Sequence, residues 1–180
     1  MPDNRLIVVD ACTWQNFAVV DGLWVLEARY ARITSWTEAI RNELQRGLRA
    51  EPKLQDVLDL ATSWLGRPVR LEGESLDKVD LIRRGMGGTA AAPLQHLGEA
   101  EAIHFLEQAA GRRVMFITDD GPAADFARRR PSGIQVLDAA AVLADAFAMG
   151  DIGCPAAYDM LQAMWDYPRE VRVPPHREVC

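Results

Sequence analysis

Short apolar runs alternate along this chain with longer stretches in which apolar residues recur every three or four positions. Four short stretches predict strands, at residues 6–9, 31–34, 114–118 and 134–137. The first and third are apolar nearly throughout, which is typical of parallel strands buried on both faces rather than of strands with one face in water. The second follows directly on another apolar stretch, at 23–26.

Helical periodicity, in which apolar residues share one face of the segment, accounts for most of the remaining chain. The segments with this pattern span residues 11–20, 37–47, 54–65, 75–84, 97–110, 122–130, 139–149 and 155–165. Strands that alternate with helices favour a parallel sheet covered on both faces. The pattern therefore predicts an α/β protein with a three-layer α/β/α fold and a central, mostly parallel sheet.

The chain has 180 residues, a length that fits one compact domain. We expect a single domain at 1–167 with an enlarged helical segment at about 50–96, followed by a proline-containing tail at 168–180. The helix near 154–166 has a largely apolar face, so we expect it either to pack on the domain or to form a homodimer interface.

Composition narrows the class of protein without fixing its function. Hydrophobic residues make up 49% and charged residues 26%, as in ordinary globular proteins, and the net charge is −6. An acidic chain is not an obvious nucleic-acid binder, because phosphate contacts need lysine and arginine. A group of metal-binding acids would, however, make the net charge more negative without excluding nucleic acid as a partner. The arginines at 128–130 could still contact a phosphate backbone.

The cysteines Cys12, Cys154 and Cys180 are odd in number and widely spaced. This arrangement predicts neither a disulfide framework nor a zinc pattern, so we expect free thiols in a reducing compartment. The histidines, His176 among them, are isolated in the sequence. We find no signal-peptide pattern and no apolar run of about 18 residues, so we expect a cytoplasmic protein without a membrane partner.

Acidic residues stand where they can meet at one edge of the predicted sheet. They follow buried strands or lie on the helices beside them, at Asp10, Glu43, Glu99, Glu101, Asp119 and Asp120. Two carboxylates about 4 Å apart repel by roughly 4 kcal/mol at an effective dielectric constant near 20. Such a pocket must bind a divalent cation or protonate some of its acids, and an all-oxygen set suits magnesium or manganese (Mg²⁺ or Mn²⁺) better than zinc.

Each of these acids also has a purely structural interpretation. Asp10 can cap the helix that follows it, and Glu43 can be a solvated helix residue. One of Glu99 and Glu101 is expected to be only a favourable first-turn charge, because residues two apart face different ways on a helix. Asp119 and Asp120 precede a glycine, as in an ordinary turn.

Four segments together resemble the ordered acidic signatures of PIN-domain ribonucleases. They are VVDAC at 8–12, EL at 43–44, GEAEA at 98–102 and FITDD at 116–120. The resemblance implies a PIN-like α/β/α fold and metal-dependent endoribonuclease activity, in many bacterial members as the toxin of a toxin–antitoxin pair. By position it implies that Asp10, Glu43, Glu101 and Asp120 form the catalytic, metal-binding quartet. Asp119 is an adjacent candidate ligand.

Three hypotheses about function follow. The first is an Mg²⁺- or Mn²⁺-dependent endoribonuclease that acts on RNA and has an antitoxin protein as a possible partner. The alternative is a non-catalytic PIN-like module that binds RNA or a protein. A third, an aspartyl phosphotransferase with Asp10 as nucleophile, is disfavoured because Cys12 stands where related phosphatases carry a second aspartate.

Overall fold

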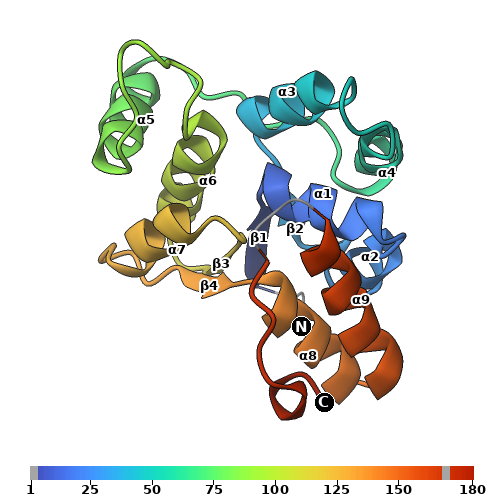
Figure 1. Ribbon diagram of the computed structural model, residues 1–180. Helices are drawn as coiled ribbons and strands as arrows, with labels where there is room; N and C mark the ends of the chain where they lie inside the picture. Colours follow the sequence, from blue (N-terminus) through green and yellow to red (C-terminus); the bar gives the residue numbers. More distant parts are fainter. Residues whose placement is uncertain (1–3, 168–170) are drawn as a thin grey trace.

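The computed structural model describes residues 4–167 and 171–180, which fold around a four-stranded, all-parallel sheet. The strands are β1 (Arg5–Val9), β2 (Thr34–Ser35), β3 (Arg113–Ile117) and β4 (Gln135–Leu137). They lie in the order β2-β1-β3-β4 (Figure 1). Central β1 pairs with β2 and β3, and its residues Ile7, Val8 and Val9 are fully buried. The apolar runs of the sequence therefore form the interior of the sheet.

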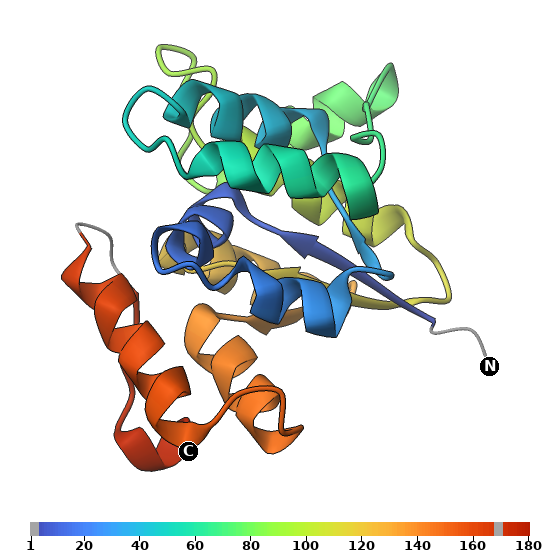
Figure 2. The ribbon, with the colours of Figure 1, turned by 90° about the vertical axis from the view of Figure 1, so that its right-hand side faces the viewer.

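Helices cover both faces of this sheet, so the α/β class is confirmed and the arrangement is compatible with three layers. The helices of the described residues are α1 (Ala11–Val19), α2 (Leu23–Tyr30), α3 (Glu38–Gly47), α4 (Leu54–Trp64), α5 (Glu74–Gly85), α6 (Leu97–Gln108), α7 (Gly121–Arg128), α8 (Ala139–Ala148), α9 (Cys154–Asp166) and the short 3₁₀ helix η1 (His176–Glu178). Figure 2 shows α3 and α4 on one side of the strands and α8 and α9 on the other.

The second strand differs from the sequence-based prediction. The prediction places it at 31–34, whereas residues 31–33 form a turn and the strand is only Thr34–Ser35. The apolar stretch at 23–26 that precedes it belongs to α2. Leu23, Leu26 and Tyr30 are buried and recur at helical spacing, so the segment covers the core as a helix and leaves few residues for β2.

The enlarged middle segment consists of α4, α5 and their connections. Leu54 and Val57 of α4 and Val79 and Ile82 of α5 are buried in the main hydrophobic core. An isolated parallel bridge joins Val69 to Thr37, at the start of α3. This segment therefore packs on the same core as the sheet and supports the helices α3 and α6.

Part of the predicted tail lies outside the described residues, at 168–170. Residues 171–180 pack on the domain, with Val171 and Val179 buried in the core. Within 4–167 and 171–180 no helix combines the length and the apolar character that crossing a membrane requires.

Candidate active site at the carboxyl edge of the sheet

Asp10 occupies the centre of this edge, directly after β1. Its backbone N–H donates to the carbonyl of Ile117 (2.9 Å), which continues the pairing of β1 with β3. Its side chain caps α1, because Oδ1 accepts from the N–H of Ala11 at 2.7 Å. Oδ2 accepts from the Cys12 thiol and the Thr118 hydroxyl, each at 3.0 Å. With 2% of its surface exposed, Asp10 is both a helix cap and a buried charge.

Asp120 reaches the same edge from the end of β3. It caps α7, since its Oδ1 accepts from the N–H of Ala123 at 2.7 Å. Thr118 links the two aspartates, because its hydroxyl accepts from the Asp120 N–H at 3.1 Å and donates to Asp10. The parallel register of β1 and β3 thus fixes the separation of two of the candidate acids.

Glu43 and Glu99 approach from the neighbouring helices α3 and α6. Gly98 allows the close packing of these helices: a Cβ there would lie 3.1 Å from Glu43 Oε2 and 3.4 Å from Ile40 Cγ1. Glu99 lies in the first turn of α6, and its side chain is only 13% exposed.

The electrostatics indicate that four acids share one environment. Burial, followed by the charges of Glu99 and Glu43, raises the pKa of Asp10 to about 8. Burial, followed by the charges of Glu43 and Asp120, raises the pKa of Glu99 to about 7. Asp10, Glu43, Glu99 and Asp120 therefore form one acid cluster, which holds bound protons near neutral pH in the absence of a cation.

His96 adds a nitrogen donor that the sequence analysis treated as isolated. It precedes α6 in a left-handed backbone conformation (φ 57°), and its Nδ1 lies 3.4 Å from Glu99 Oε1. One donor atom each from His96, Glu99 and Asp120 lie within 4.8 Å of one another. The left-handed conformation of His96, two residues before the GEAEA segment, places the imidazole here, and sequence spacing alone gives no indication of it.

Glu101, a member of the predicted quartet, has a different environment. Its Oε2 accepts from the N–H of Ala39 at 3.0 Å, in the first turn of α3, and it is also hydrogen-bonded to the side chain of Thr37. Burial raises its pKa, while these hydrogen bonds oppose the shift. The structure thus brings Glu99, not Glu101, together with Asp10, Glu43 and Asp120.

Asp119, predicted as an adjacent ligand, is engaged by side chains of α1 and by the start of α8. Its Oδ2 accepts from Thr13 Oγ1 and Asn16 Nδ2, both at 2.9 Å, and its Oδ1 accepts from the N–H of Ala139 at 2.9 Å. Burial raises its pKa despite these bonds. Asp119 therefore ties α1 to the start of α8.

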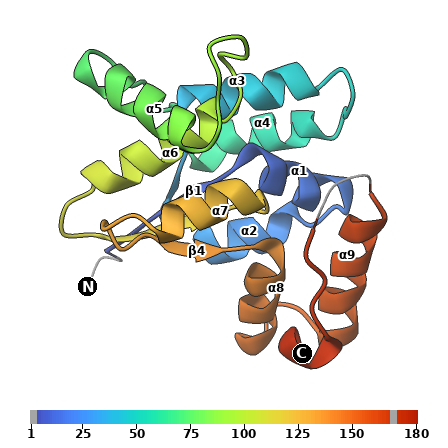
Figure 3. The same cartoon turned by 60° about the vertical axis from the view of Figure 1, so that its left-hand side comes forward.

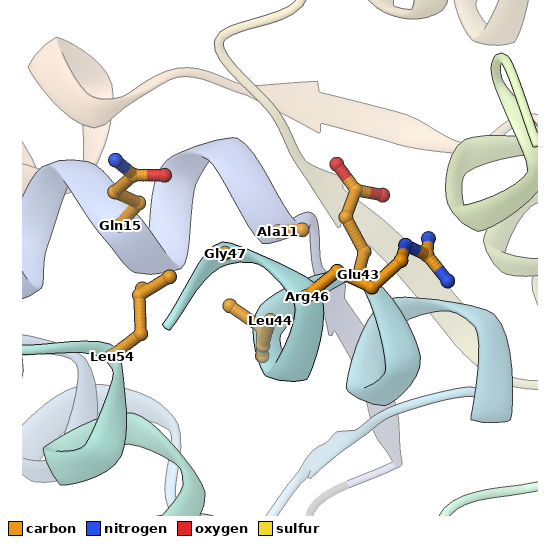
Figure 4. Close-up of a pocket in the computed structure, with 7 residues that line it drawn as sticks. All are labelled: Ala11, Gln15, Glu43, Leu44, Arg46, Gly47 and Leu54. Carbon is orange, nitrogen blue, oxygen red and sulfur yellow. The ribbon is translucent and has the colours of Figure 1, made fainter. Parts of the chain in front are cut away.

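A pocket of about 270 Å³ opens beside the acid cluster. Its lining residues come from α1, α3 and α4 and are Ala11, Gln15, Glu43, Leu44, Arg46, Gly47 and Leu54 (Figure 4). Arg46 stands one turn beyond Glu43 on α3 and also lines a second hollow together with Arg49. Both arginines are exposed. A cationic rim therefore adjoins an acidic centre.

The arginines singled out in the sequence are engaged elsewhere. Arg130 forms a two-point ion pair with Glu107 (2.6 and 3.0 Å) and lies over the Phe126 ring, and Arg128 pairs with Asp125. Arg46, by contrast, lines the pocket that contains Glu43, and Arg46 and Arg49 together line a second hollow.

The whole chain was compared with models of known protein families, with curated proteins and with solved structures, and nothing matched.

The acid cluster has the donor set of a hard divalent cation. Asp10, Glu43, Glu99 and Asp120 offer carboxylate oxygens, the ligands that Mg²⁺ and Mn²⁺ prefer, and His96 offers a nitrogen that Mn²⁺ also accepts. Burial first, and then the charges of neighbouring carboxylates, raises the pKa values of Asp10 and Glu99 and so disfavours their ionised forms. A bound dication would offset that effect and displace the protons.

Proposed function

We propose that the acid cluster binds Mg²⁺ or Mn²⁺ and that the protein hydrolyses phosphodiester bonds in RNA as an endoribonuclease. The observation that carries the proposal is the convergence of four carboxylates, from two strand ends and two helices, at one edge of a parallel sheet. Open α/β folds bind their ligands at this edge. The resemblance of the four acidic segments to PIN-domain ribonucleases supports RNA as the substrate and a toxin–antitoxin pair as the setting.

The residues of the acid cluster and its neighbours would have different roles. Asp10, Glu43, Glu99 and Asp120 would hold the cation, with His96 as a further donor. A divalent cation in such a site polarises a phosphoryl oxygen and lowers the pKa of bound water. Thr118 keeps Asp10 and Asp120 in register through its hydroxyl.

Substrate binding would use the cationic rim. Arg46 lies one turn beyond Glu43 on α3, and Arg49 follows in the turn after that helix, so a phosphate backbone laid along α3 would contact guanidinium groups before reaching the acids. Two exposed arginines that line the same hollow suit phosphate contacts. This local distribution supports RNA binding by a chain whose net charge is −6.

The decisive experiment compares two glutamates that lie two residues apart on α6. Glu99→Gln removes a charge from the acid cluster, whereas Glu101→Gln removes the same charge but retains an acceptor for the Ala39 N–H. We expect Glu99→Gln to lower Mn²⁺ affinity, measured by calorimetry, and the rate of RNA cleavage by about 100-fold or more. Glu101→Gln should stay within a few-fold of the unchanged protein in both assays.

Equal losses in the two variants, with both proteins folded, would contradict the assignment of Glu99 to the site. Mn²⁺ binding without cleavage of any RNA would reject the nuclease and favour the non-catalytic binding module. Cleavage that persists in excess chelator, or in Asp10→Asn, would show that another site is responsible.

A further inference from the structure

A second group of metal-ligating side chains lies far from the acid cluster along the chain, where the C-terminal segment returns to α9. It consists of Cys154, His176 and Cys180. One donor atom from each lies within 4.8 Å of the others, and the Cys154 Sγ and His176 Nε2 atoms are 3.4 Å apart. Figure 3 shows this segment running back beside α8 and α9 to the C-terminus.

We propose that Cys154, His176 and Cys180 bind a zinc ion that fastens the C-terminal segment to α9. Thiolates and imidazoles are the ligands that protein zinc sites use, and a set of two cysteines and one histidine leaves one coordination position open. With Zn–S and Zn–N bonds of ordinary length, tetrahedral geometry places a sulfur and a nitrogen ligand about 3.6 Å apart. The observed separation of 3.4 Å between Cys154 Sγ and His176 Nε2 is close to that value.

Local structure orders each of the three ligands. Cys154 is the first residue of α9, which fixes its backbone at the start of that helix. His176 and Cys180 are four residues apart across η1, so one helical turn carries both toward Cys154. The Cys180 thiol donates to the carbonyl of Cys154 at 3.1 Å.

The surroundings favour a built site over a chance encounter of surface groups. The Tyr158 ring, one turn beyond Cys154 on α9, packs edge-on against His176 with ring centroids 4.8 Å apart. Val179, between two of the ligands, is 2% exposed and anchors the turn in the core. His176 itself is exposed, so an ion has a path to the site.

Binding would proceed without redox chemistry. Each thiol would release its proton to solvent as its sulfur binds zinc, and the imidazole would bind as the neutral base. The three donors of the described residues leave a fourth position, which water can fill. The acid cluster, with its carboxylate oxygens, selects for a different cation, so the two sites would be loaded separately.

The test uses the full chain under reductant, in excess Mg²⁺ so that the acid cluster does not compete. Cobalt is added as a spectroscopic substitute for zinc, because thiolate ligands give it an intense charge-transfer absorption. We expect this absorption to appear at one equivalent and to be displaced by zinc. Cys154→Ser and Cys180→Ser should abolish it and His176→Gln should weaken binding by about tenfold or more, whereas Cys12→Ser should keep it.

A second measurement tests whether zinc stabilises the attachment of the C-terminal segment to α9. Zinc at one hundred times its Kd should raise the Tm of the protein by about 5 to 10 °C. It should also slow hydrogen exchange in residues 171–180, and neither effect should occur in Cys154→Ser. The Glu99→Gln variant should retain both effects, which separates failure here from failure of the proposed nuclease.

Three results would overturn the proposal. The first is no thiolate absorption in the reduced, unchanged protein. The second is an absorption that depends on Cys12 rather than on Cys154 and Cys180. The third is a Cys154–Cys180 disulfide in the purified protein whose reduction restores no metal binding.

Discussion

Replacing Asp10 by asparagine should stabilise the metal-free protein and abolish its response to Mn²⁺. The side chain is buried at the centre of the acid cluster, and its pKa is raised from 3.8 to about 8 by burial and by the charges of Glu99 and Glu43. The folded-state pKa therefore lies above the unfolded-state value. The folded protein binds the proton more tightly, so the free energy of unfolding falls as the pH rises from about 4 to about 8.

The magnitude follows from this interval. At pH 7 the unfolded aspartate is ionised while the folded one is still largely protonated, and the interval from 3.8 to 7 corresponds to roughly 4 kcal/mol at about 1.4 kcal/mol per unit. An asparagine can still accept from the Ala11 N–H and can donate to the Thr118 hydroxyl oxygen. Allowing for changed hydrogen bonds, we expect a net gain of about 1 to 3 kcal/mol at pH 7, or a Tm higher by about 3 to 10 °C.

The assay is thermal unfolding in chelator and in Mn²⁺, at several pH values between 4 and 8. In chelator, the advantage of Asp10→Asn should vanish near pH 4 and grow as the pH rises. In Mn²⁺, the unchanged protein should gain stability and the variant should not. Asp125→Asn is the matched control, because Asp125 is exposed and pairs with Arg128 on its own helix. An Asp10→Asn variant that is equally destabilised at every pH would refute the electrostatic argument.

Three further substitutions probe neighbouring parts of the structure. Gly98→Ala should lower Mn²⁺ affinity by about tenfold in calorimetry, because its Cβ would lie 3.1 Å from Glu43 Oε2 and displace that carboxylate. Gly153→Ala is the matched control, because a Cβ there meets nothing within 4 Å and the backbone φ is −76°. Asp119→Ala should lower the free energy of unfolding by about 2 to 3 kcal/mol in urea titrations, because the Ala139 N–H loses its acceptor. Its Mn²⁺ affinity should change little. Arg46→Gln should weaken RNA binding and reduce the salt-dependence slope by about 1, with Mn²⁺ binding intact.

The local sequence pattern predicts strands β1 and β3 better than it predicts strand β2. The runs that became β1 and β3 are apolar nearly throughout, because both faces of central parallel strands are covered. The stretch at 23–26 is equally apolar but belongs to a helix, α2. A short apolar run cannot distinguish the two states, and burial against the rest of the fold decided between them.

The candidate site was partly predictable for a similar reason. Asp10 and Asp120 follow strands, so their placement at the sheet edge comes from topology. The choice between Glu99 and Glu101 depends on how α6 is rotated about its axis, and the GEAEA segment alone does not specify that rotation. Gly98 offered an indication of that rotation. A residue without a Cβ permits close approach between α6 and α3, and Glu99 is the acid next to Gly98 in the sequence.

The group at Cys154, His176 and Cys180 shows what sequence spacing misses. Cys154 lies 22 residues before His176, and the intervening chain has no repeating pattern that relates the two. Their proximity results from the burial of Val171 and Val179, which returns the C-terminal segment to the core and to α9. Only His176 and Cys180, four residues apart, could have been related to each other from the sequence.

Helix N-termini distinguish the acids of this edge from one another. Glu101 and Asp119 each use oxygens to accept from the first turn of a helix remote in sequence, α3 or α8, so their charges are taken up by backbone N–H groups. Asp10 and Asp120 also cap helices, α1 and α7, but these caps use Oδ1 in each case. Their charges add to those of Glu43 and Glu99. The pKa of Asp10, raised to about 8 first by burial and then by the charges of Glu99 and Glu43, shows that one cap does not offset these effects. A divalent cation at this edge would offset them, and this is the physical basis for proposing a metal here.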